Sequence, residues 1–397
     1  MNSEFDDLVD RTQTNSLKWD YRKEVFGRDD VLPLWVADSD WKTAQPIIDA
    51  IIQRAKHGVF GYTKPGKEAT RLVVDWVREN HGWTIDPEWV VFTNGVVPSL
   101  SIALRANIKK GDGVIVQSPV YYPFFEVVDK SGAGVVTNEL ILDGTGYRMD
   151  YRGLDRICKY AGEDLPVKPK PKVLLLCNPH NPVGRVWAEE ELLHLAEICL
   201  ENELLLISDD IHAEFTYGDN RYTPIASLDE EVSRRSVTLL SPSKAFNTAG
   251  IPAGVAVIPD PLIRKKFNER KSKLLNGPSI FGLVALKAAY GSGDGWLERQ
   301  LAYLEDNIEF TLDAVEGMPG VEAFRPEGTT LIWLDFRGLE LTDEELEGFL
   351  VDKAKVGLDM GSWFGPGGEG FARLNVACQR ETVKEGLSRI SRALEDI

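Results

Sequence analysis

Seven short apolar runs occupy the first two thirds of this chain, and segments of helical periodicity separate several of them. One such segment, Glu189 to Leu200, places apolar residues three and four positions apart. Alternation of this kind predicts an α/β fold in which helices cover both faces of a mostly parallel, seven-stranded sheet. The runs are Trp89 to Thr93, Val114 to Gln117, Val135 to Leu142, Val173 to Cys177, Leu204 to Ser208, Val237 to Leu240 and Gly254 to Ile258.

The last third of the chain has a different pattern, which predicts a smaller α+β unit. A chain of 397 residues is too long for one typical core, so two domains that share an interface are expected. The expected helices are 294–315, 343–356 and 381–394, and the expected strands are 330–336 and 371–377.

Polar side chains follow three of the apolar runs. Asn178 follows the fourth run and Lys244 follows the sixth. Asp209 and His212 follow the fifth. Open α/β sheets place their ligand chemistry at the carboxyl ends of strands. These strand ends therefore supply an amide, an amine, and a carboxylate with an imidazole.

Lys244 is the most constrained of these residues. Burying an unpaired cation is costly, so a lysine at the end of a buried strand must have its ammonium group held. Lys244 is therefore a candidate Schiff-base lysine, and the alternative is an ordinary surface lysine in a Ser-Pro loop. A pyridoxal phosphate site requires an amine to form an imine, an acid against the pyridine nitrogen, and donors for the ring oxygen.

Composition argues against several other functions. The net charge of −17 predicts repulsion from phosphate backbones and anionic lipid, so neither a nucleic acid nor a membrane partner is expected. The apolar runs are also far shorter than the ~20 residues that cross a bilayer.

The four cysteines lack a C-x-x-C pair, which indicates thiols in a reducing compartment. The five histidines lack metal spacing, so no metal is expected. The N-terminus lacks the features of a secretory signal, and we expect a cytoplasmic protein.

Eight short motifs, spread from near the start to near the end of the chain, carry a resemblance to a known family. On these motifs the chain resembles the fold-type I pyridoxal phosphate enzymes of the class I/II aminotransferase family. Within that family it is most similar to the cystathionine β-lyase-like C–S lyases, the MalY/PatB group. The motifs are Lys18-Trp-Asp20, Leu34-Trp-Val-Ala-Asp38, Phe60-Gly-Tyr-Thr63, Pro119-Val-Tyr-Tyr-Pro-Phe124, Asn178-Pro-His-Asn-Pro-Val-Gly184, Ser208-Asp-Asp-Ile-His212, Ser241-Pro-Ser-Lys244 and Phe371-Ala-Arg-Leu-Asn375.

The resemblance implies roles for the residues at the strand ends. Lys244 would hold the aldehyde of the cofactor and later take the proton from the substrate Cα. Asp209 would keep the pyridine nitrogen protonated, whereas residue type alone also allows a helix N-cap aspartate. Asn178 would hydrogen-bond the ring oxygen and touch the substrate carboxylate. His212 would serve the same oxygen, at a position where many aminotransferases carry a tyrosine.

A second group of residues is expected around the cofactor ring and phosphate. Tyr121 resembles the aromatic residue that stacks over the ring, which adds it to the catalytic set, and Tyr122 beside it is the alternative. Backbone N–H groups at the start of a helix bind anions. The expected phosphate donors are Gly95, Val96, Val97 and the hydroxyl of Ser241.

Three more residues extend the expected site toward the substrate and a second subunit. Arg373 resembles the arginine that binds the substrate α-carboxylate as a bidentate pair, and Trp35 is expected to contact the substrate. Tyr62 resembles the tyrosine that reaches the phosphate of the neighbouring subunit, which implies a homodimer with a shared active site. The alternative for Tyr62 is a loop-packing tyrosine. Pro252 stands where many aminotransferases carry an arginine paired with the phosphate, and the C–S lyase group commonly lacks that arginine too.

The resemblance also implies domain bounds and a reaction. Residues 47–290 would form the large cofactor domain, and residues 1–46 with 291–397 would form a discontinuous small domain. The expected reaction is α,β-elimination from cysteine S-conjugates such as cystathionine, which releases a thiol, pyruvate and ammonia. The alternatives are an aminotransferase that uses the same residues and a pyridoxal-fold regulatory protein.

Overall fold

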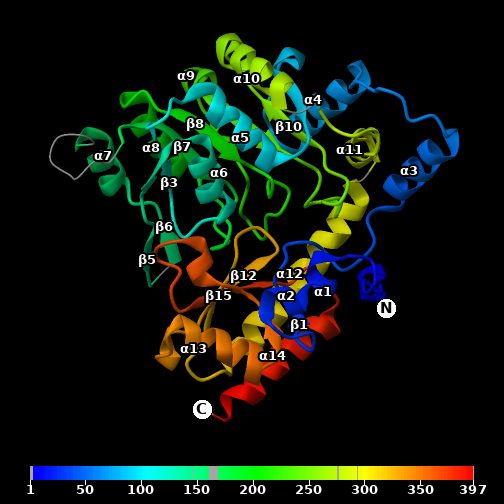
Figure 1. Ribbon diagram of the computed structural model, residues 1–397, viewed down its shortest axis with the longest axis vertical. Helices are drawn as coiled ribbons and strands as arrows, with labels where there is room; N and C mark the ends of the chain where they lie inside the picture. Colours follow the sequence, from blue (N-terminus) through cyan, green and yellow to red (C-terminus); the bar gives the residue numbers. More distant parts are fainter. Residues whose placement is uncertain (1–2, 145, 161–168, 275–276, 293, 397) are drawn as a thin grey trace.

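The computed structural model describes residues 3–144, 146–160, 169–274, 277–292 and 294–396. Figure 1 shows an upper part built around the main sheet and a lower part that holds the C-terminal helix together with the first helices of the chain. Among the described residues, no helix combines the length and the apolar character needed to pass through a bilayer.

Seven strands form the main sheet, which confirms the predicted architecture. They are β2 (Val90–Thr93), β3 (Gly113–Val116), β4 (Gly134–Thr137), β7 (Pro171–Cys177), β8 (Leu205–Asp209), β9 (Ser236–Leu240) and β10 (Gly254–Val257). Their order across the sheet is β2-β10-β9-β8-β7-β3-β4. β10 runs antiparallel to both neighbours, and the other adjacent pairs are parallel.

Both faces of this sheet are buried, which explains why its strands appear as continuous apolar runs. Successive residues of a strand point to opposite faces. Val173 accordingly packs in the cluster of α5 (Val96–Asn107), and Leu174 packs in the cluster of α8 (Glu189–Glu201). The other helices of this part are α3 (Gln45–His57), α4 (Lys67–His81), α6 (Pro123–Ser131), α7 (Tyr151–Tyr160), α9 (Glu230–Arg234), α10 (Pro261–Leu274) and α11 (Ile280–Ser292).

The apolar run 135–142 does not form one strand. β4 ends at Thr137, and the side chain of Asn138 accepts a hydrogen bond from Gln117 Nε2 at 3.2 Å and donates one to the carbonyl of Asp150 at 3.1 Å. These bonds hold the chain where it leaves the sheet. The residues that follow form a separate hairpin of β5 (Ile141–Asp143) and β6 (Gly146–Arg148).

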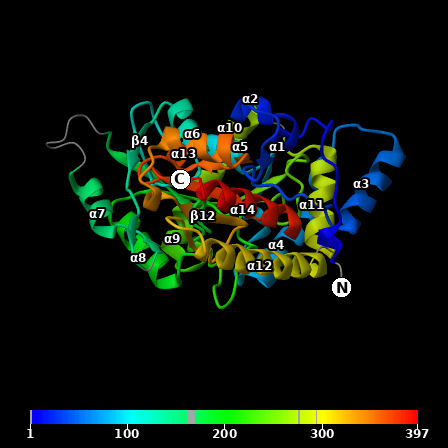
Figure 2. The same ribbon diagram turned by 90° about the horizontal axis from the view of Figure 1, so that it is seen from below.

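The lower part contains a four-stranded antiparallel sheet. Its strands, in spatial order, are β11 (Glu322–Phe324), β12 (Leu331–Asp335), β15 (Phe371–Asn375) and β14 (Asp359–Met360). The long helix α12 (Asp294–Glu316) and the helix α14 (Arg380–Leu394) lie side by side, as Figure 2 shows from below. β12, β15, α12 and α14 agree with the predicted elements, whereas β11 and β14 are short strands that were not predicted.

The predicted helix 343–356 is too long. The α-helix α13 spans Asp343–Gly348, and a π-helical stretch, Phe349–Lys353, follows it. Lys355 then adopts a left-handed backbone conformation with φ of 56°, which a helix cannot continue through. The next residues form β13 (Val356–Gly357), so the last part of the apolar pattern is a strand.

The N-terminal segment contacts the C-terminal part of the chain. β1 (Leu32–Pro33) pairs in parallel with β13, and Asn375 Nδ2 donates to the carbonyl of Val36 at 2.8 Å. Figure 1 shows the short helices α1 (Leu17–Asp20) and α2 (Arg22–Phe26) in the same lower part. On these contacts we propose a large domain of residues 47–290 and a discontinuous small domain of residues 1–46 and 291–397.

Candidate active site

A cavity of about 190 Å³ lies at the carboxyl ends of β7, β8 and β9. Distant parts of the chain form its wall: the ends of these strands, the start of α5, residues 121–122 before α6, Leu17 with the segment 35–37, and the strands β14 and β15 of the small sheet. The predicted residues in this wall are Trp35, Val96, Val97, Tyr121, Asp209, His212, Lys244 and Arg373. The fold therefore brings most of the predicted site together.

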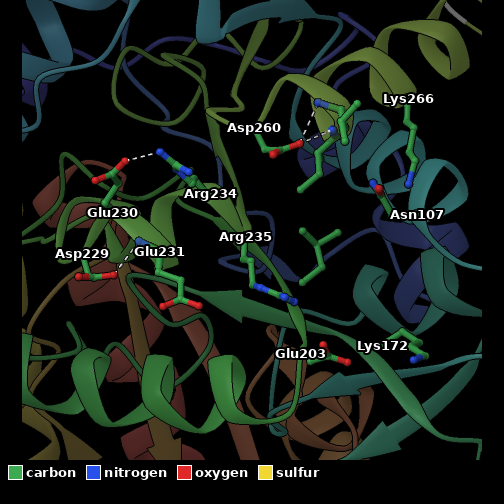
Figure 3. Close-up of a pocket in the computed structure, with 13 residues that line it drawn as sticks. Asn107, Lys172, Glu203, Asp229, Glu230, Glu231, Arg234, Arg235, Asp260 and Lys266 are labelled. Carbon is green, nitrogen blue, oxygen red and sulfur yellow. Dashed lines mark hydrogen bonds and ion pairs between the residues drawn. The ribbon is translucent and has the colours of Figure 1, made fainter.

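A larger hollow of about 950 Å³ lies on the surface near the amino ends of β7 and β8, where Lys172 and Leu205 line it (Figure 3). Two of its acidic side chains stabilise the helices around it. Asp260 accepts two backbone N–H groups in the first turn of α10, both at 2.8 Å, and Glu230 pairs with Arg234 within α9. Sheets of this type carry their chemistry at the opposite edge, so we assign the active site to the smaller cavity.

Lys244 lies four residues beyond the end of β9 and in the cavity wall. Its Nζ donates a hydrogen bond to the carbonyl of Ala37 at 2.5 Å. Loss of hydration and the positive charge of Arg373 lower the pKa of Lys244 to about 8. Roughly one Lys244 side chain in ten is therefore neutral at pH 7, and a neutral amine is a nucleophile and a base.

Asp209 ends β8 with its carboxylate buried at the cavity wall. Burial raises its pKa to about 7, against the opposing effects of the Ile211 N–H, which donates to Oδ1 at 3.2 Å, and of Lys244. The residues that follow Asp209 form turns rather than a helix, which removes the N-cap alternative. No described residue forms an ion pair with this carboxylate, so the site favours a ligand that brings a cationic group, such as a protonated pyridine nitrogen.

His212 is buried in the same wall. Burial, together with the charges of Lys244 and Arg373, lowers its pKa well below the usual value, so the imidazole is neutral. Its Nδ1 has no hydrogen-bond partner among the described residues. A buried polar atom in that state is costly unless a ligand satisfies it.

Asn181, rather than Asn178, lies in the cavity wall. The side chain of Asn178 is directed elsewhere, because its Nδ2 donates to the carbonyl of Thr223 at 3.1 Å. Asn181 Oδ1 accepts a hydrogen bond from Arg373 Nη1 at 2.9 Å. Both asparagines precede a proline in the same short turn, and the sequence contains no signal that separates them. We therefore propose Asn181 for the role that the sequence analysis gave to Asn178.

Tyr121 lies in the wall between the start of α6 and the asparagine turn. Its backbone N–H donates to the carbonyl of Asn181 at 3.0 Å, which fixes the loop. Burial raises the pKa of the Tyr121 hydroxyl, so it stays protonated. Tyr122 also lines the cavity, and the two rings are 5.4 Å apart between centroids. The structure therefore offers two aromatic side chains for contact with a flat ligand.

The start of α5 lies at the cavity, where the sequence predicts an anion site. Gly95 is the N-cap residue with φ of 127°, a backbone conformation that favours glycine. Val96 and Val97 begin the helix and line the cavity. Ser241, the fourth predicted donor, is buried but does not line the cavity. Its hydroxyl donates a hydrogen bond to the carbonyl of Ala253 at 2.6 Å.

Tyr62 does not reach this cavity. It lies fully exposed on the connection between α3 and α4, which Figure 1 shows at the periphery of the molecule. It does not line the cavity that holds Lys244 within one chain. Its predicted role in a second subunit stays a prediction.

Arg373 projects from β15 into the cavity wall, and it is buried. Its guanidinium lies over the ring of Phe364, 4.9 Å from the centroid. Nη2 donates to the carbonyl of Trp35 at 3.0 Å and also pairs with the buried carboxylate of Asp359. Burial raises the pKa of Asp359 to about 6, against the effects of Arg373 and Lys244. Asp359 could not be predicted from the sequence because β14 is too short to show a strand pattern.

The family model for aminotransferase class I and II matches residues 30–390. The chain belongs to this family. It is 41% identical over 395 residues to cystathionine β-lyase PatB of Bacillus subtilis (strain 168), which covers 98% of this chain and 99% of that protein.

Two solved structures have the same fold over the whole chain. Cystalysin from Treponema denticola, whose structure contains a pyridoxal 5′-phosphate cofactor, has a TM-score of 0.94 and 34% identity, covering 100% of both chains. The pyridoxal phosphate-bound C–S lyase from Staphylococcus hominis has a TM-score of 0.90 and 31% identity, covering 99% of this chain and 98% of that chain. Both carry the cofactor that the sequence analysis expected.

The residues of this cavity fit pyridoxal phosphate. Lys244 offers an amine of lowered pKa, and Asp209 offers an unpaired buried carboxylate. The first turn of α5 offers backbone N–H groups to a phosphate. His212 Nδ1 also lacks a partner among the described residues. The family is pyridoxal phosphate-dependent, and these groups match the amine, the acid and the anion site that the cofactor needs.

Proposed function

We propose that the protein is a pyridoxal phosphate-dependent C–S β-lyase of the cystathionine β-lyase type. Its substrates would be cysteine S-conjugates such as cystathionine, and its products a thiol, pyruvate and ammonia. The observation that carries the proposal is the full-length likeness to a cystathionine β-lyase at 41% identity, in a chain that keeps an amine, a carboxylate and a guanidinium in one cavity. The catalytic residues alone would equally serve an aminotransferase.

The cavity residues would each hold one part of the cofactor. The backbone N–H groups of Val96 and Val97 would bind the phosphate, Asp209 would face the ring nitrogen, and Tyr121 would contact the ring. Bound pyridoxal phosphate supplies an aldehyde for the substrate amine and a ring that accepts the electron pair left at Cα. The charge of Asp209 matters because it keeps the ring nitrogen protonated.

Lys244 and Arg373 would act on the substrate itself. Arg373 binds the α-carboxylate and thereby orients the Cα–H bond. Lys244 Nζ, in its neutral form, removes the Cα proton, and a pKa of about 8 suits that transfer. The thiolate then leaves from Cβ with the electron pair of the C–S bond and takes up a proton, and water converts the remaining aminoacrylate to pyruvate and ammonia. His212 and Asn181 would hold the polar atoms around the reacting centre.

We also propose a homodimer with shared active sites, in the cytoplasm. The connection that carries Tyr62 exposes three apolar side chains, Val59, Phe60 and Tyr62, which suits a surface covered by a second copy. Tyr62 would then reach the phosphate site of the other subunit. The four cysteines are free thiols, which supports a reducing compartment.

A single assay separates the lyase from an aminotransferase. The purified holoenzyme is given cystathionine, and pyruvate and free thiol are measured with and without an added keto acid. Formation of both products without a keto acid is expected. Turnover that occurs only with a keto acid would replace the lyase proposal with transamination. Lys244→Ala protein serves as the control for uncatalysed product formation.

A further inference from the structure

Asp359 and Arg373 lie side by side on neighbouring strands of the small sheet. They are directly opposite in the antiparallel pair of β14 and β15, and residues in that position have Cβ atoms close enough for their side chains to interact. Both side chains are almost completely buried, with exposed fractions of 2% and 3%. Asp359 therefore forms an ion pair with the guanidinium of Arg373. This is the same guanidinium that would bind the substrate carboxylate in the proposed function.

The hydrogen bonds of Arg373 leave no pair of N–H groups free to bind a second carboxylate bidentately. A guanidinium binds a carboxylate bidentately through one of two forks, Nε with Nη2 or Nη1 with Nη2. Both forks include Nη2, and Nη2 already donates to Asp359 and to the carbonyl of Trp35. The Nε–H has no partner among the described residues. A ligand carboxylate must therefore displace one of the two acceptors at Nη2.

Asp359 is the acceptor that can leave. The carbonyl of Trp35 belongs to a backbone segment that Asn375 Nδ2 holds by donating to the carbonyls of Val36 and Asp38, both at 2.8 Å. Asp359 holds Arg373 only through a side chain with rotatable bonds. Its second oxygen, Oδ1, also has no partner among the described residues, so few contacts oppose its movement.

We propose that Asp359 is a positioning residue that occupies Arg373 until a ligand carboxylate displaces it, and that this exchange sets the affinity of the site for the substrate carboxylate. The proposal rests on the proposed function, in which Arg373 binds the α-carboxylate. Asp359 keeps the guanidinium in place between turnovers, and it competes with every carboxylate ligand.

Charge balance makes the exchange proton-linked. The groups that face Asp359 are Arg373 on β15, Lys244 beyond β9, and Tyr121 and Tyr122 before α6. Without a ligand, one carboxylate faces one guanidinium. With a ligand, the ligand carboxylate and the displaced Asp359 are both buried near one guanidinium, and a like charge nearby favours the protonated form of an acid. Ligand binding should therefore draw a proton onto Asp359.

The test uses the holoenzyme and 3-(methylthio)propanoate, which carries a carboxylate and a thioether but no amine to react. Calorimetry gives its dissociation constant for the wild type and for Asp359→Asn. Asparagine keeps an oxygen that accepts from Nη2 but removes the competing charge, so we expect binding about tenfold tighter. Asp352→Asn removes the same charge from an exposed position of the small sheet region and should leave the dissociation constant unchanged.

Equal or weaker binding of the probe by Asp359→Asn overturns the proposal, because a residue that only supports Arg373 would produce that result. With cystathionine, the variant should show a lower KM without a matching loss of kcat. Repeating the wild-type titration in two buffers of different ionisation enthalpy counts the protons taken up, which keeps the proposal testable if the variant does not fold. No uptake near pH 7 also overturns it.

Failure of the proposed function gives a different result. If Arg373→Lys binds the probe as tightly as the wild type does, then Arg373 is not the carboxylate site and the proposed function loses its substrate anchor. If Arg373→Lys weakens binding and Asp359→Asn does not change it, only the inference about Asp359 fails.

Discussion

The pH dependence of cofactor capture tests the environment of Lys244. Only a neutral amine attacks an aldehyde. Loss of hydration and the charge of Arg373 lower the pKa of Lys244 from 10.5 to about 8. At pH 7 roughly one side chain in ten is then neutral, against about one in three thousand for an unshifted lysine, which is a gain of ~300-fold.

The assay mixes apoenzyme with pyridoxal phosphate at a series of pH values between 6 and 10. The visible absorbance of the lysine-bound cofactor gives the rate of capture. Because the neutral fraction rises about tenfold per pH unit below the pKa, the rate should rise with that slope up to about pH 8 and then level off. Lys244→Ala protein gives the background from other amines.

A wild-type rate that still climbs about tenfold between pH 9 and 10 would refute the reasoning, since it would mean an unshifted lysine. Arg373→Gln is the matched test of the electrostatic cause. It removes the positive charge that lowers the pKa of Lys244, so its rate should level off at a higher pH than that of the wild type. An unchanged profile in this variant would assign the whole shift to lost hydration.

Three further predictions test other parts of the site. In Gly254→Ala, the new Cβ would lie 2.8 Å from Gly95 Cα, so the start of α5 must shift, and a cofactor titration should show about tenfold weaker affinity. An equimolar mixture of Tyr62→Ala and Lys244→Ala subunits should regain up to about a quarter of wild-type activity after subunit exchange, because about half of the dimers would be mixed and one of the two sites in each would be intact; no recovery would exclude a shared site. Asp209→Asn should raise the melting temperature of the apoenzyme at pH 8 but not near pH 4. The folded-state pKa of about 7 lies above the ordinary 3.8, so ionised Asp209 destabilises the fold only at the higher pH.

The strands and their polar ends could be predicted because the local sequence determines them. A strand buried on both faces must be apolar throughout, so its end is visible as the first polar residue, and Asp209 follows this rule. Lys244 lies four residues beyond the end of its strand, β9. The helix predicted over 343–356 was wrong because pairing with β1, a contact remote in sequence, makes Val356 part of a strand.

Other site residues depend on contacts that no local pattern contains. Asn178 and Asn181 have the same neighbour and the same residue type, and only the fold determines which side chain meets Arg373. Asp359 reaches the site through a two-residue strand whose partner is fourteen positions away. The carbonyl of Ala37, which accepts from Lys244 Nζ, is a backbone group that every residue type carries.

The guanidinium of Arg373 shows why these contacts matter for function. It joins the turn of Asn181 from the large sheet, the carbonyl of Trp35 from the N-terminal segment, and Asp359 from the small sheet. A ligand carboxylate that takes the place of Asp359 would alter only one of these three contacts. The other two would keep the guanidinium aligned with the end of β9, where Lys244 lies. The substrate carboxylate would therefore be bound at a fixed position relative to Lys244, the base that removes the proton. A change at Asp359 could alter the affinity for the substrate without moving Lys244.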